Sequence, residues 1–315
     1  MKRIGVLTSG GDAPGMNAAI RSVVRCGIDA RMEVWGIHRG YEGLLDGEIM
    51  PMDRSSVGDI LHRGGTILKT ARSERFMEAS WIDKAAEILK TFAIEGLVVI
   101  GGDGSLRGGL ELSKRGMTVM GLPGTIDNDL NGTDHCPGFA SAAKYIATSC
   151  AEVWQDAHVY DTGMITVVEI MGRHAGWLAG SAALASLTGC GPDLVYLPET
   201  DFDMDKFLAD VKAIYEKTGK CMVAVSEGIH YADGTFVSEA KTSATDGFGH
   251  AQLGGLATLL AETVKNATGA KVRGIELSLL QRCGSHVASR TDVTEAWQAG
   301  AAAVEAAVAG TTDKM

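Results

Sequence analysis

The sequence lacks the features that mark several large protein classes. Its six cysteines are scattered without C-x-x-C pairs, which disfavours a zinc or redox site and fits reduced thiols inside a cell. The net charge of −10 disfavours a nucleic-acid-binding protein, because such proteins need a basic face. No apolar run approaches the roughly 20 residues of a membrane span, and the N-terminal run is too short for a signal sequence. We therefore expect a cytoplasmic protein that binds neither nucleic acid nor membranes.

Glycine is abundant instead, with 41 of 315 residues. No Gly-X-Y period accompanies it and 45% of the residues are hydrophobic, which excludes collagen and disorder. The predicted strands are residues 4–7, 33–37, 96–100, 117–122, 164–170, 193–197, 222–226 and 274–279; the predicted helices are residues 16–31, 82–93, 106–115, 140–154, 204–216, 253–266 and 301–309. This alternation predicts an α/β fold with mainly parallel sheets flanked by helices, whose ligands lie at the carboxyl ends of the strands.

The sequence gives only a weak signal for domain boundaries, because no long linker rich in Pro, Ser or Gly interrupts the chain. The polar segments Asp127–Cys136 and Thr242–His250 are the best candidates for crossings between two lobes. Two crossings predict a discontinuous arrangement. One lobe would comprise residues 1–138 plus 251–300, and the other residues 139–250 plus 301–315.

Two glycine turns each follow a predicted strand and precede a predicted helix. They are Gly10–Asp12 and Gly101–Ser105. Glycine removes the Cβ that would keep a phosphate from the backbone amides, and the following helix adds unpaired N–H groups and the positive end of its dipole. Neither turn ends in the Gly-Lys-Ser/Thr of a Walker A loop. The pattern predicts phosphate binding, although a tight turn without a ligand would look the same.

Carboxylates stand next to these turns. Asp103 would repel a bound phosphate unless a cation lay between them, and Mg²⁺ held by a carboxylate and phosphate oxygens resolves the conflict. The alternative is that Asp103 caps the helix that follows. After the next strand, Asp127 and Asp129 stand two residues apart, so one could accept a proton from a substrate hydroxyl while the other faces the metal. A turn rich in Asp and Asn is the alternative for this second segment.

Three arginines follow glycine-rich or apolar segments. Arg72 follows Gly64-Gly65, Arg173 follows the strand predicted at 164–170, and Arg282 follows a further apolar run. The guanidinium group binds phosphate with two parallel hydrogen bonds, so arginines in these places favour an anionic ligand. Each of them alone could equally be a solvated surface charge.

Together these residues resemble the ATP-dependent, bacterial-type phosphofructokinase family over nearly the whole chain. The most specific motifs are Gly-Gly-Asp-Ala-Pro-Gly-Met-Asn at 10–17, Pro-Gly-Thr-Ile-Asp-Asn-Asp at 123–129 and Met-Gly-Arg-His-Ala-Gly at 171–176. The resemblance implies transfer of the γ-phosphate of ATP to the 1-hydroxyl of fructose 6-phosphate in glycolysis, with Mg²⁺. It also implies a nucleotide-binding first lobe, a sugar-phosphate-binding second lobe, and a homotetramer or homodimer.

The resemblance carries residue roles with it. Asp127 would be the general base and Asp103 the magnesium ligand, and Thr125, Asp129 and Arg173 would also be catalytic. ATP would be held by Gly11, Arg72, Ser73, Gly102, Asp103, Gly104 and Ser105. The sugar phosphate would face Thr125, Ile126, Asp127, Met171, Gly172, Arg173, Glu227, Arg273 and Arg282. Glycine at positions 104 and 124, where pyrophosphate-using relatives typically carry Asp and Lys, implies ATP as the phosphoryl donor.

The chain also departs from the family pattern. Met164 and Leu279 stand where the family usually has an arginine and a histidine that contact the sugar phosphate. The family's usual effector site is only partly matched, so we expect no effector control of the usual kind. The alternatives are a kinase of the same family with another sugar phosphate or with pyrophosphate as donor, and a non-catalytic nucleotide-sensing subunit. An NAD kinase or lipid kinase would leave the motifs at 10–17 and 125–129 unexplained.

Overall fold

The structure is a computed structural model that describes residues 1–238 and 255–315. The described chain divides into two compact units. Unit 1 comprises Met1–Ser141 and Arg282–Met315, and unit 2 comprises Ala142–Gln281. Among the described residues, no helix is long and apolar enough to cross a membrane.

Unit 1 is built on a five-stranded sheet. Its strands are β1 (Arg3–Thr8), β2 (Glu33–Ile37), β3 (Ile49–Met52), β4 (Gly96–Gly101) and β5 (Thr118–Pro123), in the order β3-β2-β1-β4-β5. Only β3 runs antiparallel to its neighbour. All six residues of β4 are buried, as expected for a central strand covered on both faces. The prediction of a mainly parallel α/β sheet is confirmed for this unit.

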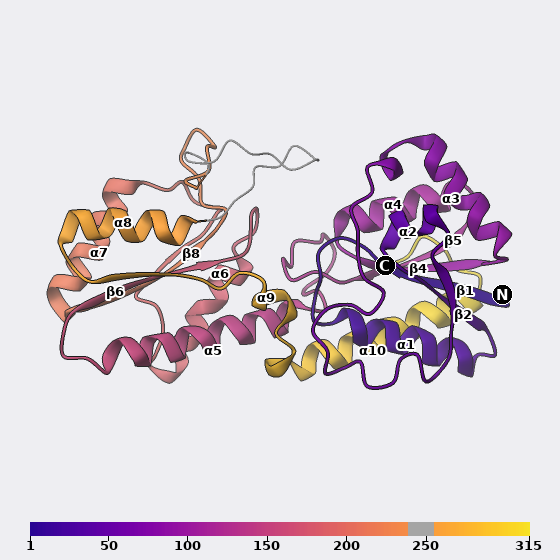
Figure 1. Ribbon diagram of the computed structural model, residues 1–315, viewed down its shortest axis with the longest axis horizontal. Coiled ribbons are helices and arrows are strands. Elements are labelled where there is room, and N and C mark those ends of the chain that lie inside the picture. Colours follow the sequence, from indigo (N-terminus) through magenta and orange to yellow (C-terminus); the bar gives the residue numbers. More distant parts are fainter. Residues whose placement is uncertain (239–254) are drawn as a thin grey trace. The chain divides into compact units, whose positions relative to one another are not determined.

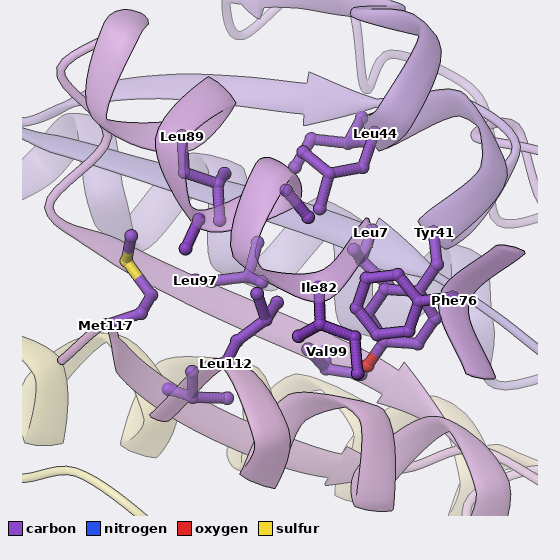
Figure 2. Close-up of a cluster of buried hydrophobic side chains, with 14 of the residues drawn as sticks. Leu7, Tyr41, Leu44, Phe76, Ile82, Leu89, Leu97, Val99, Leu112 and Met117 are labelled. Carbon is purple, nitrogen blue, oxygen red and sulfur yellow. The ribbon is translucent and has the colours of Figure 1, made fainter. Parts of the chain in front are cut away.

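Helices cover both faces of this sheet. One face carries α2 (Gly40–Asp46), α3 (Ala79–Thr91) and α4 (Asp103–Ser113), and the other carries α1 (Met16–Asp29) and α10 (Arg290–Val308) (Figure 1). The buried side chains of the first face form a hydrophobic cluster that includes Leu44, Leu89 and Leu112 (Figure 2). This cluster fixes the sheet against the helices that begin at its carboxyl edge.

Unit 2 is built on a four-stranded, fully parallel sheet. Its strands are β6 (Met164–Ile170), β7 (Leu194–Tyr196), β8 (Lys220–Ser226) and β9 (Val272–Glu276), in the order β7-β8-β6-β9. One face carries α7 (Met204–Thr218) and α8 (Leu256–Thr268), and the long helix α5 (Phe139–His158) lies along the other (Figure 1). Unit 2 also contains the short helix α6 (Trp177–Ser181) and a 3₁₀ turn at Ala182–Thr188. The short helix α9 (Leu280–Cys283) spans the boundary at Arg282, and the 3₁₀ turns at Arg75–Met77 and Ser285–Val287 belong to unit 1.

The predicted domain boundaries need correction. The chain returns to unit 1 at Arg282, whereas the sequence predicted 251–300 in the first lobe and 301–315 in the second. Helix α8 belongs with unit 2 because it packs on β9, where a Cβ at Gly274 would lie 2.7 Å from the Ala257 carbonyl oxygen. Helix α10 belongs with unit 1 because it packs closely on α1, where a Cβ at Gly300 would lie 2.6 Å from that of Ser22. The predicted crossing at Thr242–His250 lies outside the described residues.

Candidate functional site

The turns after β1, β4 and β5 meet at the carboxyl edge of the unit 1 sheet. The Ser9 amide donates to the Ile100 carbonyl at 3.0 Å, and the Gly124 amide donates to the Gly101 carbonyl, also at 3.0 Å. Adjacent parallel strands end at the same edge, so their following turns are brought together by the sheet itself. The two glycine turns and the Thr125–Asp129 segment therefore form one continuous site.

The glycines of this site differ in the space around them. A Cβ at Gly11 or Gly104 would meet no atom within 4 Å, so both positions leave open room beside the backbone. A Cβ at Gly101 would lie 2.5 Å from the Ser9 carbonyl oxygen, and one at Gly124 would lie 2.9 Å from the Ile100 side chain. Gly101 and Gly124 are thus required by packing, whereas Gly11 and Gly104 leave space that a phosphate could use.

Asp103 is the first residue of α4, and the N-cap position belongs to Gly102. The capping alternative for Asp103 therefore fails. Its side chain is 63% exposed and pairs with Arg107 one turn along, with 3.0 Å between Oδ2 and the guanidinium nitrogen. Among the described residues, no group of three or more His, Cys, Asp or Glu side chains could hold a metal ion. One exposed carboxylate beside an open glycine turn fits Mg²⁺ that arrives with nucleotide phosphates, because Mg²⁺ is usually held by one or two carboxylates plus substrate phosphates.

The segment from Thr125 to Leu130 alternates in burial. Ile126, Asn128 and Leu130 are buried, whereas Thr125, Asp127 and Asp129 are partly or fully exposed, so the polar set faces away from the core. The Asp127 amide donates to the Thr125 hydroxyl at 3.2 Å. Burial, with smaller contributions from Asp129 and Asp127, raises the pKa of the Cys136 thiol to about 11, which makes this thiol an inert neighbour of both carboxylates.

Sequence reasoning missed the role of Asn128. It is buried and has φ +57°, and its carboxamide accepts from the Cys136 amide at 2.8 Å and donates to the Asp134 carbonyl at 3.3 Å. These bonds hold the 134–136 turn against the carboxylate segment. The Asn-Asp pattern was the available signal, since Asn tolerates positive φ better than most residues.

Arg282 lies in unit 1 near the β1 turn. Burial raises the pKa of Asp12, and the positive charge of Arg282 is among the influences that lower it. The Asp12 carboxylate accepts from the Thr66 amide at 3.0 Å, so it also holds the segment that leads to Arg72. Arg282 is therefore close enough to Asp12 for its charge to act on the β1 turn, and its contact with an anionic ligand stays a prediction.

A second group of predicted residues gathers at the carboxyl ends of β6 and β8 in unit 2. The Gly172 amide donates to a Glu227 carboxylate oxygen at 3.3 Å, and a Cβ at Gly228 would lie 2.0 Å from the Arg173 carbonyl oxygen. The Met171 amide donates to the side-chain carbonyl of buried Gln281 at 3.1 Å. The structure thus brings Met171, Gly172, Arg173 and Glu227 together and adds Gln281, which sequence reasoning missed.

Glu169 lies just below this group and is only 3% exposed. Its carboxylate accepts from the Ala257 amide at the start of α8, at 2.8 Å. Burial raises the pKa of Glu169 to about 7, with smaller upward contributions from Glu276 and Glu227 and an opposing one from the Ala257 amide. The group therefore changes charge near neutral pH.

Arg273 does not join the group at the carboxyl ends. It pairs in register with Thr166, which lies five residues before Met171, about 16 Å along the strand at roughly 3.3 Å per residue. This separation exceeds the reach of an arginine side chain. Arg273 instead lines an open hollow of about 320 Å³ with Met164, Thr166, Lys271 and residues of α5.

Three comparisons identify what the chain is similar to. The family model described as Phosphofructokinase matches residues 3–307. An "ATP-dependent 6-phosphofructokinase" of Shouchella clausii is 44% identical over 292 residues, which cover 91% of this chain and 89% of the relative. An "ATP-dependent 6-phosphofructokinase 1" of Clostridium perfringens is 41% identical over 319 residues, which cover all of this chain and 89% of the relative.

Solved structures of similar fold include a relative described as dependent on pyrophosphate. The crystal structure of a "Pyrophosphate-dependent phosphofructokinase" from Nitrosospira multiformis matches with a TM-score of 0.86 at 30% identity, covering 99% of this chain and 78% of the other. A Pichia pastoris phosphofructokinase in the T-state matches with a TM-score of 0.81 at 32% identity, covering 98% of this chain and 32% of the other. The fold predicted from the sequence, an α/β protein of the kind seen in these structures, is confirmed.

Proposed function

The chain belongs to the phosphofructokinase family, and from that premise we propose that it transfers the γ-phosphoryl group of ATP to the 1-hydroxyl of fructose 6-phosphate. The products would be fructose 1,6-bisphosphate and ADP, which makes the protein a cytoplasmic glycolytic kinase. The observation that carries the proposal is the single edge of the unit 1 sheet, where two open glycine turns meet the exposed face of Thr125–Asp129.

Asp127 is the general base in this proposal. It lies on the exposed face of a segment whose buried residues fix its direction, and the hydrogen bond that its backbone N–H donates to the Thr125 hydroxyl holds the local turn. A carboxylate held there can accept the proton of the sugar hydroxyl as the phosphoryl group arrives. Phosphoryl transfer needs little covalent chemistry from the protein, so positioning and charge neutralisation supply most of the rate.

The other proposed contacts fall into two sets, one for the nucleotide and one for the sugar phosphate. Gly11, Gly104 and the amides at the start of α4 receive the nucleotide phosphates, with Arg72 as the cation. Asp103 would hold Mg²⁺, which neutralises phosphate charge when it is bound. The resemblance to the family implies that Met171, Gly172, Arg173, Glu227 and Arg282 would face the sugar phosphate.

ATP is the proposed donor because Gly104 leaves open space beside the backbone. A Cβ there would meet nothing within 4 Å, so the glycine leaves free the space that a nucleotide's α-phosphate requires. The test is a coupled assay of phosphorylated product with ATP and with pyrophosphate, across fructose 6-phosphate, tagatose 6-phosphate and sedoheptulose 7-phosphate. Turnover with pyrophosphate and none with ATP would overturn the donor, and preference for another sugar phosphate would overturn the acceptor.

We also propose a homo-oligomer whose sugar-phosphate sites are shared between copies. Arg273 is too far along its strand to reach the group around Met171 in the same chain, so a contact with the sugar phosphate would have to be made to a second copy. Lys271 lines the same hollow and supplies a cation beside Met164, where the family usually has an arginine. Mass measurement in solution tests the assembly, and a monomer with full activity would contradict it.

A further inference from the structure

The segment that carries Arg72 lies against the short helix α2 through one carboxylate. The Ser73 hydroxyl donates to Glu42 Oε2 at 2.5 Å, and the guanidinium group of Arg75 donates to Glu42 Oε1. Arg75 also donates to Asp46 Oδ1 at 2.8 Å. Both oxygens of Glu42 are therefore engaged by residues that follow Arg72 within three positions.

This cluster is only partly buried. The exposed fractions are 21% for the Glu42 side chain and 31% for Arg75. The hydrogen bond from Arg75 holds the pKa of Glu42 below its usual range, and the Ser73 hydroxyl lowers it further. Glu42 is thus charged at neutral pH. Ion pairs this exposed contribute little to folding stability, so stability alone does not account for two donors converging on one carboxylate.

The residue before Glu42 makes a second connection. The Tyr41 ring stacks on the Phe76 ring (Figure 2). The ring centroids are 4.1 Å apart and the planes are inclined by 17°. The Tyr41 hydroxyl donates to the Ser105 carbonyl at 2.5 Å. Helix α2 therefore contacts both segments that the proposed function assigns to ATP, the one at Arg72–Ser73 and the turn at Gly102–Ser105.

We propose that Glu42 is a positioning residue of the nucleotide site, which fixes Ser73 and Arg75 on α2 and so orients Arg72 toward the ATP phosphates. This inference rests on the proposed function of the site. In this inference the Ser73 hydroxyl bonds to Glu42. Ser73 therefore affects ATP binding through the position of the 72–75 segment. Tyr41 sets the spacing between this segment and the phosphate turn, and Glu42 sets its orientation.

The central experiment compares Glu42→Gln with Glu48→Gln. The amide that replaces the Glu42 carboxylate keeps the size and one acceptor oxygen but removes one of the two negative charges that pair with Arg75. We expect the KM for ATP to rise about tenfold in Glu42→Gln, while the KM for fructose 6-phosphate and the melting temperature stay near those of the unaltered protein. Glu48 is a matched control because it is a nearby, partly exposed carboxylate that pairs with Arg39 at 2.5 Å instead of with Arg75.

The pattern of constants decides the inference. A rise of less than twofold in the KM for ATP, an equal rise in both KM values, or the same rise in Glu48→Gln would each overturn it. Arg75→Gln should reproduce the effect of Glu42→Gln, and the double variant should be no worse than either single one, because all three remove the same link. Additive losses in the double variant would contradict the single link.

The proposed function and this inference can fail separately. The donor assay on the unaltered protein tests the function without any variant. If the unaltered protein used pyrophosphate, the proposal of ATP as donor would fail. The positioning role of Glu42 would then fail too only if Glu42→Gln left the KM for pyrophosphate unchanged. If ATP is the donor and Glu42→Gln leaves its KM unchanged, the inference alone is wrong.

Discussion

The candidate site residues are distributed differently on the two sheets. In unit 1 the two glycine turns and the Thr125–Asp129 segment, proposed to hold the phosphates and the general base, lie at one edge, where turns after three strands are tied by backbone hydrogen bonds. In unit 2 one group lies at the carboxyl ends of the strands, while Arg273 lies about 16 Å away along β9. Residues at one edge of a sheet can contact the same ligand. Residues that lie far apart along a strand cannot contact one ligand within the same unit. In the proposed function, one edge of unit 1 therefore supplies the phosphate turns and the base together, whereas the residues of unit 2 would have to contact more than one ligand position.

Removing the base should have the largest effect and should be confined to catalysis. We expect Asp127→Ser to lower kcat by about 10²–10⁴-fold, because a positioned general base typically contributes that much, while ATP binding stays largely intact. Steady-state kinetics and a nucleotide titration measure the two quantities. Asp134→Ser is the control, since Asp134 is an exposed carboxylate of the same loop. If Asp127→Ser keeps more than about a tenth of kcat, the base assignment is wrong.

The next largest effect is expected from filling the open space at Gly104, which tests the proposed nucleotide site. Gly104→Asp should lower kcat/KM for ATP by about 100-fold, because the new carboxylate occupies free space and repels the phosphates. The melting temperature should change little, because no atom lies within 4 Å of the new Cβ. Gly180→Asp in unit 2 is the matched control, since that position is equally open. An equal loss in both variants would contradict a specific role for position 104.

The spread-out residues of unit 2 predict behaviour that unit 1 does not. Arg273→Gln should raise the KM for fructose 6-phosphate by about 10- to 100-fold, the usual value of a charge-assisted bond, and leave the KM for ATP near normal. Co-expressing Arg273→Gln chains with Asp127→Ser chains should restore part of the activity, because mixed sites would combine intact residues from two copies. No recovery in assemblies shown to be mixed would contradict shared sites.

Glu169 should have the smallest effect on turnover and a measurable one on stability. Its pKa rises from about 4.5 when unfolded to about 7 when folded, so the folded state binds more protons between these values and loses stability as pH rises from 4.5 to 7. Glu169→Gln keeps an acceptor for the Ala257 amide and removes the titration. Relative to the original protein, the variant should gain up to about 3 kcal/mol between pH 5 and pH 8. Denaturant unfolding at the two pH values measures this gain, and an equal difference at both would refute the linkage.

The sequence could predict elements that consist of a short, local run of apolar residues. The strand predicted at 164–170 matches β6, all of whose residues are buried, and the strand predicted at 33–37 matches β2. The pattern did not indicate β3, which contains Pro51 and is largely exposed, or α2, which has seven residues and two glycines. Helix α2 carries Glu42, so the positioning link could not be predicted from the motifs.

The domain boundaries could not be predicted because they depend on packing between distant segments. The alanine-rich end indicated a tightly packed helix, but only the contact between Gly300 and Ser22 shows which unit it completes. The same limit applies to Gln281 and Asn128, whose roles rest on hydrogen bonds to backbone groups 110 and 8 residues away. The motif residues were predictable because each follows its own strand directly.

The placement of α10 has a consequence for the order in which the molecule can form during synthesis. Unit 2 is one continuous stretch, so it is complete before residues 282–315, which return to unit 1, have been made. Unit 1 begins first but lacks α10, which covers the buried face of α1 and bonds through Trp297 to Ser22 at 2.6 Å. Domains fold as their residues become available. Residues 1–141 are therefore made before unit 2 but completed after it, and the face of α1 that α10 covers stays exposed until then.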